Sequence, residues 1–437
     1  MIYEIRCELD DFEGLYHLAN LYTAVCELEK EHRAVAFLRC TESTRATDPS
    51  TVLMKVRHLV SGASLTLAFE MSDRSDVFNM EALDVCDVYF KRSYYAPDLL
   101  PLAARLRERI LPGGLNFTCR TPSSSRRLLP LLIARYCSRA IASPRSVFHN
   151  LSLHKRILSS FVRSPLLPEF EHQPDCDVDR IILFQTRVWE PTDIQPDLAE
   201  EVNGRRVELV RALKAEFGPL FRGGLVPDAY ACEHYPDAVT VEPWRRDQFI
   251  ARSKRALIGI YTRGLHHSLA FKLPEYLASS KCIVSEPLRN ELAKPLTPGL
   301  NYLEFLSVDE CLEQCVRLLS EKNLVERMRR ANWEYYRAHV YPSSNLANCL
   351  ERAFSKPALS RALGVNSPPA PEARFKHVVD PKRRQSDSVS FLPKPSPYPA
   401  GRRSWILNTS RPPTGPLANI PAAGCQRLGM VCGVLRR

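Results

Sequence analysis

The residues best placed for chemistry are a lysine and a glutamate three positions apart, Lys272 and Glu275. They follow the apolar run 256–261, which is typical of a strand buried on both faces of a parallel sheet. Pro274 predicts the start of a helix, because a proline in the first turn loses no hydrogen bond. The apolar run 282–285 predicts the next strand, so the segment forms one βαβ unit. Both side chains then lie above the carboxyl ends of the strands, where open α/β sheets bind ligands.

The segment 271–284, F-K-L-P-E-Y-L-A-S-S-K-C-I-V, resembles the K-L-x-E-Y-x-A-x-G-K-x-I-V segment of GT-B glycosyltransferases of the group 1 type, a family with distant spore-maturation-like members. The resemblance implies that Glu275 holds the ribose of a nucleotide sugar, and that Lys272 and the preceding loop face its diphosphate. The loop residues concerned are Gly264, His266 and Ser268. These roles agree with the chemistry, since a carboxylate can accept both ribose hydroxyl protons, and a lysine beside a helix N-terminus suits a phosphate.

Two observations leave alternatives open. Ser280 stands where the family has a glycine that caps the helix in a left-handed conformation, so we expect the serine to disturb the helix end. A lysine and a glutamate at this spacing are also typical of a solvated surface ion pair without a function.

The residues around this unit predict a second α/β domain. The strand 181–184 leads into Arg187, whose guanidinium is placed to bind a diphosphate by the same resemblance; an ion pair or a solvated arginine is the alternative. Apolar spacing predicts further helices at 200–217, 244–251, 308–320 and 324–338, and strands at 235–241 and 301–305.

The first part of the chain also alternates between strands and helices. We expect strands at 1–5, 34–38, 65–69 and 85–90, and helices at 15–31, 77–83, 99–110 and 127–141. This order predicts a doubly wound, mostly parallel sheet, so the whole chain is expected to hold two Rossmann-like domains of the GT-B type. The predicted domain bounds are 1–150, a linker at 151–178, 179–350, and a disordered tail at 356–437.

An inverting transferase needs a general base that faces the cleft from the first domain. The candidates are Asp10, with its neighbour Asp11, His17 and Asp73. The aspartates have structural alternatives, because Asp10 and Asp11 can equally cap a helix and Asp73 can occupy a turn. Similarly, His266 can contact a sugar or phosphate, or simply occupy a surface turn.

The net charge of +11 is located in the tail, which holds 14 Lys and Arg but 3 Asp and Glu, whereas the remainder is balanced. The tail is rich in proline, lacks periodic apolar segments and is expected to be disordered. Fourteen cysteines without a C-x-x-C motif indicate reduced thiols in a cytoplasmic protein. No apolar run is long enough to span a bilayer.

The leading hypothesis is therefore a cytoplasmic glycosyltransferase that moves a sugar from a nucleoside-diphosphate sugar to an unknown acceptor. The resemblance implies no bound metal and no cofactor beyond this co-substrate. The D-x-D motif at 175–177 lies in the predicted linker, where it is either an acidic solvated segment or a chelator of a divalent cation. The alternatives are a catalytically inactive nucleotide-binding protein of the same fold, and a protein that binds acidic partners weakly through its basic tail.

Overall fold

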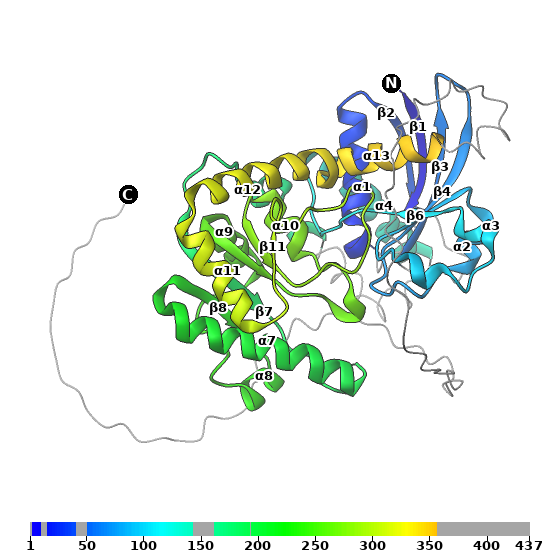
Figure 1. Ribbon diagram of the computed structural model, residues 1–437. Helices are drawn as coiled ribbons and strands as arrows, with labels where there is room; N and C mark the ends of the chain where they lie inside the picture. The colour runs from blue at the N-terminus through cyan, green and yellow to red at the C-terminus, as the bar shows by residue number, and fades with distance from the viewer. Residues whose placement is uncertain (1, 10–14, 41–49, 143–160, 193, 356–437) are drawn as a thin grey trace, which may run out of the picture. The chain divides into compact units, whose positions relative to one another are not determined.

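The computed structural model describes residues 2–9, 15–40, 50–142, 161–192 and 194–355. They belong to one compact unit, and the predicted tail lies outside the described residues. The expected α/β class is confirmed, because helices pack against two separate sheets, shown in blue to cyan and in green in Figure 1.

The first sheet has six strands in the order β2-β1-β3-β4-β5-β6. Their bounds are β1 Tyr3–Leu9, β2 Ala34–Cys40, β3 Thr51–His58, β4 Ser64–Glu70, β5 Val88–Lys91 and β6 Ile110–Pro112. Strand β3 is antiparallel to both of its neighbours, and the other pairs are parallel. The sequence analysis missed β3, although its buried Val52, Met54 and Val56 alternate with more exposed residues.

The helices beside this sheet are α1 Leu15–Lys30, α2 Met80–Val85, α3 Ala104–Arg107 and α4 Pro122–Ala142. The predicted helix at 99–110 is wrong. Residues 96–99 form a 3₁₀ turn, α3 is a single turn, and the segment ends in β6. Pro97 and Pro101 lack the amide hydrogens that a continuous helix needs, so the chain crosses this region in short pieces.

The second sheet is wholly parallel and has the order β11-β10-β9-β7-β8. Its strands are β7 Asp179–Thr186, β8 Phe221–Leu225, β9 Ala256–Tyr261, β10 Cys282–Ser285 and β11 Leu303–Glu304. The strand predicted at 235–241 is wrong, because only an isolated bridge joins Val239 to Leu225. The order reverses direction between β7 and β9, and open α/β sheets commonly bind ligands at the carboxyl ends of the strands beside such a reversal.

The helices of this part are α6 Leu167–Phe170, α7 Pro196–Phe217, α8 Ala229–His234, α9 Arg246–Arg255, α10 Lys272–Ala278, α11 Val308–Ser320, α12 Lys322–Tyr335 and α13 Pro342–Phe354. Helix α11 begins at its predicted position because Ser307 caps it, its hydroxyl oxygen accepting from the amide of Glu310 at 3.1 Å.

Helix α10 ends without the expected disturbance. Ser280 itself adopts the left-handed conformation, with φ of 44°, and its hydroxyl donates to the carbonyl of His172 at 2.5 Å. The backbone amide of Lys281 also donates to the carbonyl of Tyr276, as in a glycine-capped helix. The serine therefore keeps the helix end that the sequence analysis expected it to disturb.

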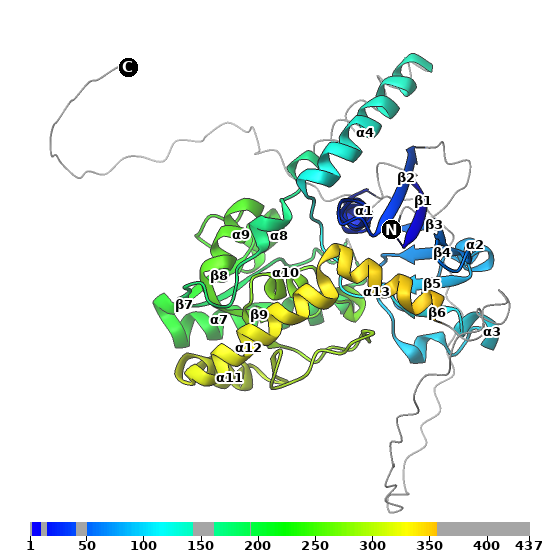
Figure 2. The ribbon, with the colours of Figure 1, turned by 90° about the horizontal axis from the view of Figure 1, so that it is seen from above.

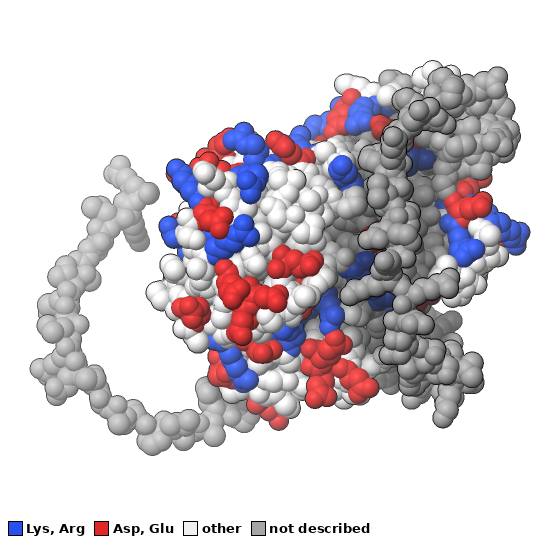
Figure 3. Space-filling model, viewed as in Figure 1, with Lys and Arg blue, Asp and Glu red and all other residues white. Residues whose placement is uncertain are grey.

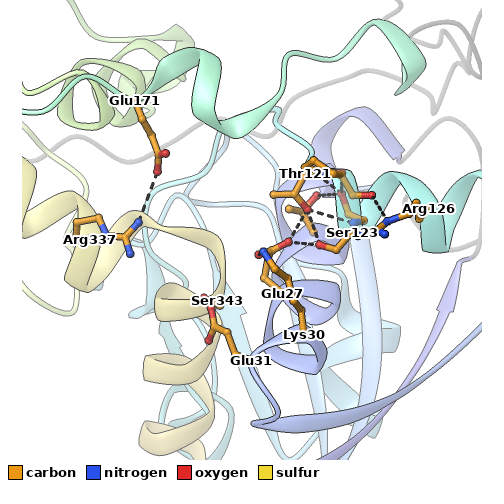
Figure 4. Close-up of polar contacts among 12 residues, drawn as sticks. Glu27, Lys30, Glu31, Thr121, Ser123, Arg126, Glu171, Arg337 and Ser343 are labelled. Carbon is orange, nitrogen blue, oxygen red and sulfur yellow. Dashed lines mark hydrogen bonds and ion pairs between the residues drawn. The ribbon is translucent and has the colours of Figure 1, made fainter.

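Helix α13 returns to the first sheet and lies beside α1 in both ribbon views (Figures 1 and 2). Its Leu346 and Leu350 belong to the same core cluster as β1 and α1. Ser343 at its start donates to Glu31 at 2.6 Å, and Arg337 just before it pairs with Glu171 at 3.6 Å (Figure 4).

On the face in Figure 3, acidic and basic side chains are interspersed over the second sheet and its helices. No helix in the described part of the chain is long and apolar enough to cross a membrane.

Candidate functional site

The reversal between β7 and β9 places Arg187 and the loop after β9 at one edge of the second sheet. The loop is closed by a hydrogen bond of 2.9 Å from the amide of Gly264 to the carbonyl of Ser268. A Cβ at position 264 would lie 2.5 Å from the Ser268 hydroxyl oxygen, so a side chain there would have to displace this hydroxyl. His266 and His267 both have φ in the left-handed region, 54° and 60°. Such backbone conformations in non-glycine residues concentrate at ligand-binding sites.

Glu275 lies on α10 and is 3% exposed. Both of its carboxylate oxygens accept hydrogen bonds from the guanidinium of Arg246, one of them at 3.0 Å. Arg246 begins α9 and keeps 42% of its side chain exposed. The sequence analysis missed it, because 29 positions separate it from Glu275 and only the folded chain joins them. The pairing gives the buried carboxylate two charge-assisted hydrogen bonds.

Lys272 is half-buried beside Glu275, and its ammonium donates to the backbone carbonyl of Gln185 in β7. Burial, with the nearby charges of Arg206, Arg187 and Arg246, lowers the pKa of Lys272 to about 7, although Glu275 acts in the opposite direction. A lysine with this pKa gains a proton readily when an anion approaches.

Arg206 on α7 completes a group of positive charges at this edge. It is 7% exposed and donates to the carbonyl oxygens of Arg187 at 2.7 Å and of Arg263 at 3.1 Å. Its Nε has no hydrogen-bond partner among the described residues. Burial and the charge of Arg187 lower the pKa of Arg206 to about 10. A buried guanidinium held by carbonyl oxygens, beside another arginine, favours an anion as its ligand.

The sequence carried a signal for Arg206 that the analysis did not use. It lies four positions after Val202 and four before Val210, on the buried stripe of α7. A charged residue on such a stripe needs a partner or a function.

The first sheet contributes side chains to the same loop. Arg92 is 4% exposed and donates to Asp73 at 2.6 Å and to the carbonyl oxygen of Leu269 at 2.6 Å. Its guanidinium also lies 5.1 Å from the ring centroid of Phe271. Arg92 therefore ties the carboxyl edge of the first sheet to the loop that precedes α10.

Two of the predicted acceptor-side residues meet at this junction. The ring of His17 lies 6.4 Å from that of Phe271, centroid to centroid. Burial raises the pKa of the Asp73 carboxyl, but the Arg92 charge and hydrogen bond, with smaller effects of His17 and Ser268, outweigh it and hold the pKa below its usual value. The structure thus brings together His17, Asp73 and the loop around Ser268, whereas Asp10 and Asp11 lie outside the described residues.

Arg187 points its guanidinium over the ring of Trp189, 4.5 Å from the centroid. His266 is half-buried, and burial together with the Arg74 charge lowers its pKa. No group of three or more His, Cys, Asp or Glu in the described ranges is arranged to hold a metal ion. A surface hollow between α7 and α11, lined by Arg205, Arg211 and Asp309 among others, contains none of the predicted site residues.

No protein-family model matches the sequence, and no curated protein sequence matches it. Among solved structures, the C-terminal domain of a glycosyl transferase group 1 family protein (LpcC) from Francisella tularensis is 9% identical, with a TM-score of 0.28, over 38% of this chain and 94% of that one. The S. aureus MnaA–UDP co-structure is 11% identical, with a TM-score of 0.34, over 82% of this chain and 99% of that one. Sucrose-phosphate synthase from Thermosynechococcus elongatus is 12% identical, with a TM-score of 0.30, and the chain covers 51% of it. Identities and scores this low do not show to which family the chain belongs.

Proposed function

We propose that the chain is a glycosyltransferase of the GT-B type that binds a nucleoside-diphosphate sugar at the β7–β9 edge. The observation that carries the proposal is the grouping of Arg187, Arg206 and Lys272 beside a buried carboxylate, Glu275, at a reversal of strand order. Basic groups suit the diphosphate, and the carboxylate suits the ribose hydroxyls. The loop 264–268 would cover the diphosphate through its backbone.

In this proposal the acceptor hydroxyl attacks the anomeric carbon of the donor. The bond from that carbon to the diphosphate breaks, and its electron pair goes to the phosphate oxygen, whose charge Lys272 and Arg206 stabilise. His17 would accept the proton of the acceptor hydroxyl, and the ionised Asp73 nearby would stabilise the resulting imidazolium. No step in this scheme requires a metal ion. Asp10 stays a candidate base by its predicted position only.

Arg246 adds a condition to this scheme. It occupies both oxygens of Glu275, so it must release at least one of them before a ribose can bind. Its exposed side chain is able to move aside without opening the core.

A second candidate is a protein that binds the nucleotide without transferring a sugar. The acceptor side favours it, because the ion pair of Asp73 with Arg92 and its lowered pKa make Asp73 a poor proton acceptor and leave transfer dependent on His17 as the base. Release of nucleoside diphosphate from a donor in the presence of an acceptor pool distinguishes transfer from binding alone.

Calorimetric titration of the full chain with uridine, guanosine and adenosine diphosphates, and with their sugar conjugates, tests the site. We expect one nucleotide to bind, and Glu275→Ala to weaken it at least about tenfold, because hydrogen bonds to a charged group are lost. The matched control is Glu313→Ala, which removes an exposed glutamate on α11. Binding that survives Glu275→Ala unchanged, or no binding of any nucleotide, would contradict the assignment.

A further inference from the structure

The segment that follows β7 carries Arg187 out of the second sheet, and it has no regular secondary structure of its own. Strand β7 ends at Thr186, and residues 187–190 belong to no helix or strand. Backbone groups that leave a sheet need new hydrogen-bond partners wherever they are buried. This segment finds such partners among the side chains of α7.

Asn203 of α7 binds the backbone of Trp189 through both polar atoms of its side-chain amide. Its Oδ1 accepts from the backbone amide of Trp189 at 2.8 Å, and its Nδ2 donates to the carbonyl oxygen of the same residue at 2.7 Å. Asn203 is 1% exposed. Two short bonds to one residue fix the orientation of its backbone as well as its position, because hydrogen bonds weaken steeply when they are misaligned.

The two residues before Trp189 have anchors of their own. Arg206 lies three positions after Asn203, on the same side of α7, and donates to the carbonyl oxygen of Arg187 at 2.7 Å. Val188 is 4% exposed and belongs to the core of the second sheet. Each residue of the segment 187–189 is thus held by a separate contact.

The side chain of Arg187 lies on the ring that this segment carries. Its guanidinium is 4.5 Å from the centroid of the Trp189 ring. The attraction of a guanidinium to the face of a tryptophan restricts the arginine to orientations that keep this contact. Because Asn203 holds the backbone of Trp189, it also limits where the ring, and with it Arg187, can lie.

Asparagine at position 203 has two possible explanations. The other buried residues of α7 are mostly aliphatic, and a buried amide costs free energy unless it is hydrogen-bonded. One explanation is structural: Asn203 satisfies the backbone of Trp189 and does nothing more. The other is that Asn203 positions Arg187, and only this explanation predicts an effect on ligand binding that depends on Arg187.

We propose that Asn203 is a positioning residue of the candidate donor site, which holds Arg187 for the diphosphate through the backbone and ring of Trp189. The inference rests on the proposed function, since it takes Arg187 as a ligand of the diphosphate. Asn203 itself touches no substrate in this scheme and acts through Trp189 alone.

A double-mutant cycle on the full chain, measured by calorimetry with inorganic pyrophosphate as the probe, tests the inference. Pyrophosphate has no ribose, so its binding does not depend on the release of Glu275 by Arg246. We expect Arg187→Ala to weaken pyrophosphate binding at least about tenfold, because charge-assisted hydrogen bonds are lost. Asn203→Ala should weaken it at least about fivefold, and the double variant should match Arg187→Ala within about twofold.

Two further variants separate positioning from a loss of structure. Asn203→Leu removes both hydrogen bonds while keeping a side chain of similar size, so it should weaken binding as Asn203→Ala does. The matched control is Asn348→Ala on α13, whose amide also donates to a backbone carbonyl, that of Ala338 at 2.8 Å. It should leave the affinity unchanged with and without Arg187. The thermal midpoint and the binding stoichiometry of each variant show whether a weaker signal reflects unfolded protein.

The outcomes distinguish the inference from the function on which it rests. If the effects of Asn203→Ala and Arg187→Ala add in the double variant, Asn203 acts independently of Arg187 and the inference is wrong. The same conclusion follows if Asn203→Ala lowers the thermal midpoint but leaves the affinity unchanged. If pyrophosphate does not bind, or binds equally well to Arg187→Ala, the donor site itself is wrongly assigned, and the inference falls with it.

Discussion

Lys272 is held in a position that disfavours its own charge. Its pKa of about 7 follows from burial and from three neighbouring arginines, and a bound diphosphate would act in the opposite direction and raise it. Binding above pH 7 must therefore be accompanied by proton uptake, whereas below pH 7 the lysine is already charged.

We accordingly expect the affinity for the nucleoside diphosphate to be nearly constant below pH 7. Above it, affinity should fall by up to about tenfold per pH unit as neutral Lys272 has to be protonated. Calorimetry in two buffers with different ionisation enthalpies measures this proton uptake directly. The Lys272→Met variant should bind the nucleotide more weakly, and its affinity should no longer depend on pH above 7. If the variant kept this pH dependence, another group would be the one that titrates.

The sequence predicted this residue and its neighbour Glu275 because both lie within one short segment, where strand, proline and helix follow each other. It did not predict Arg246, Arg206 or Arg92. Their roles depend on contacts across 29 to 177 positions, which only the packed sheets create. Residue type and local spacing thus supplied these two candidates, which stay a prediction, and the tertiary structure supplied the charged groups around them.

At the scale of elements, the site depends on how closely α10 lies against β9. Gly259 of β9 faces the ring of Tyr276, and a Cβ there would lie 2.8 to 3.0 Å from three ring atoms. Tyr276 is fully buried and has little room to move. The glycine therefore sets the height of α10, and with it the position of Lys272 and Glu275, above the sheet.

Gly259→Ala should destabilise the protein by about 1–3 kcal/mol through overpacking, and should weaken nucleotide binding as well. The control is Gly204→Ala in α7, where the backbone is helical and the added Cβ would have no neighbouring atom within 4 Å. That change should stabilise by about 0.5–1 kcal/mol. Urea unfolding measures the free energy of unfolding of both variants. If Gly259→Ala left it unchanged, α10 would tolerate displacement from the sheet.

Helices and strands were predicted correctly where the residues that mark them lie within the element itself. The bounds of β9, β10 and α11 agree with the sequence prediction because continuous apolar runs and a serine cap mark them. Strand β3 was missed although its alternation is visible, because it contributes an antiparallel strand to a sheet that was expected to be mostly parallel. The proposed domain bounds stay a prediction.

At the scale of the whole described chain, α13 joins parts that the sequence analysis treated separately. It follows a π-helix at Tyr336–Val340, whose Tyr336 donates to Glu171 at 2.9 Å. Tyr336 belongs to a core cluster that also contains Leu115 and Phe117 from the region of the first sheet. Leu350, further along, belongs to the core of that sheet itself. The two parts are thus linked by buried side chains that pack in one cluster, as well as by backbone.

This linkage predicts that the two sheets unfold together, and the distribution of tryptophan allows the prediction to be tested. The described tryptophans, Trp189, Trp244 and Trp333, all belong to the second part of the chain, so in a Trp405→Phe background fluorescence follows that part while circular dichroism follows both. Leu350→Ala creates a cavity in the first core and should cost about 2–5 kcal/mol. Because one buried cluster contains side chains from both parts of the chain, we expect the fluorescence midpoint in urea to fall together with that of circular dichroism.

Glu326→Ala, an exposed change on α12, is the control and should move neither midpoint measurably. A fluorescence midpoint that stays in place while the dichroism midpoint falls would show that the second sheet keeps its structure after the first has unfolded. In that case α13 would stabilise only the core in which it ends, and the contacts of Arg92 with the loop before α10 would be too weak to couple the two sheets.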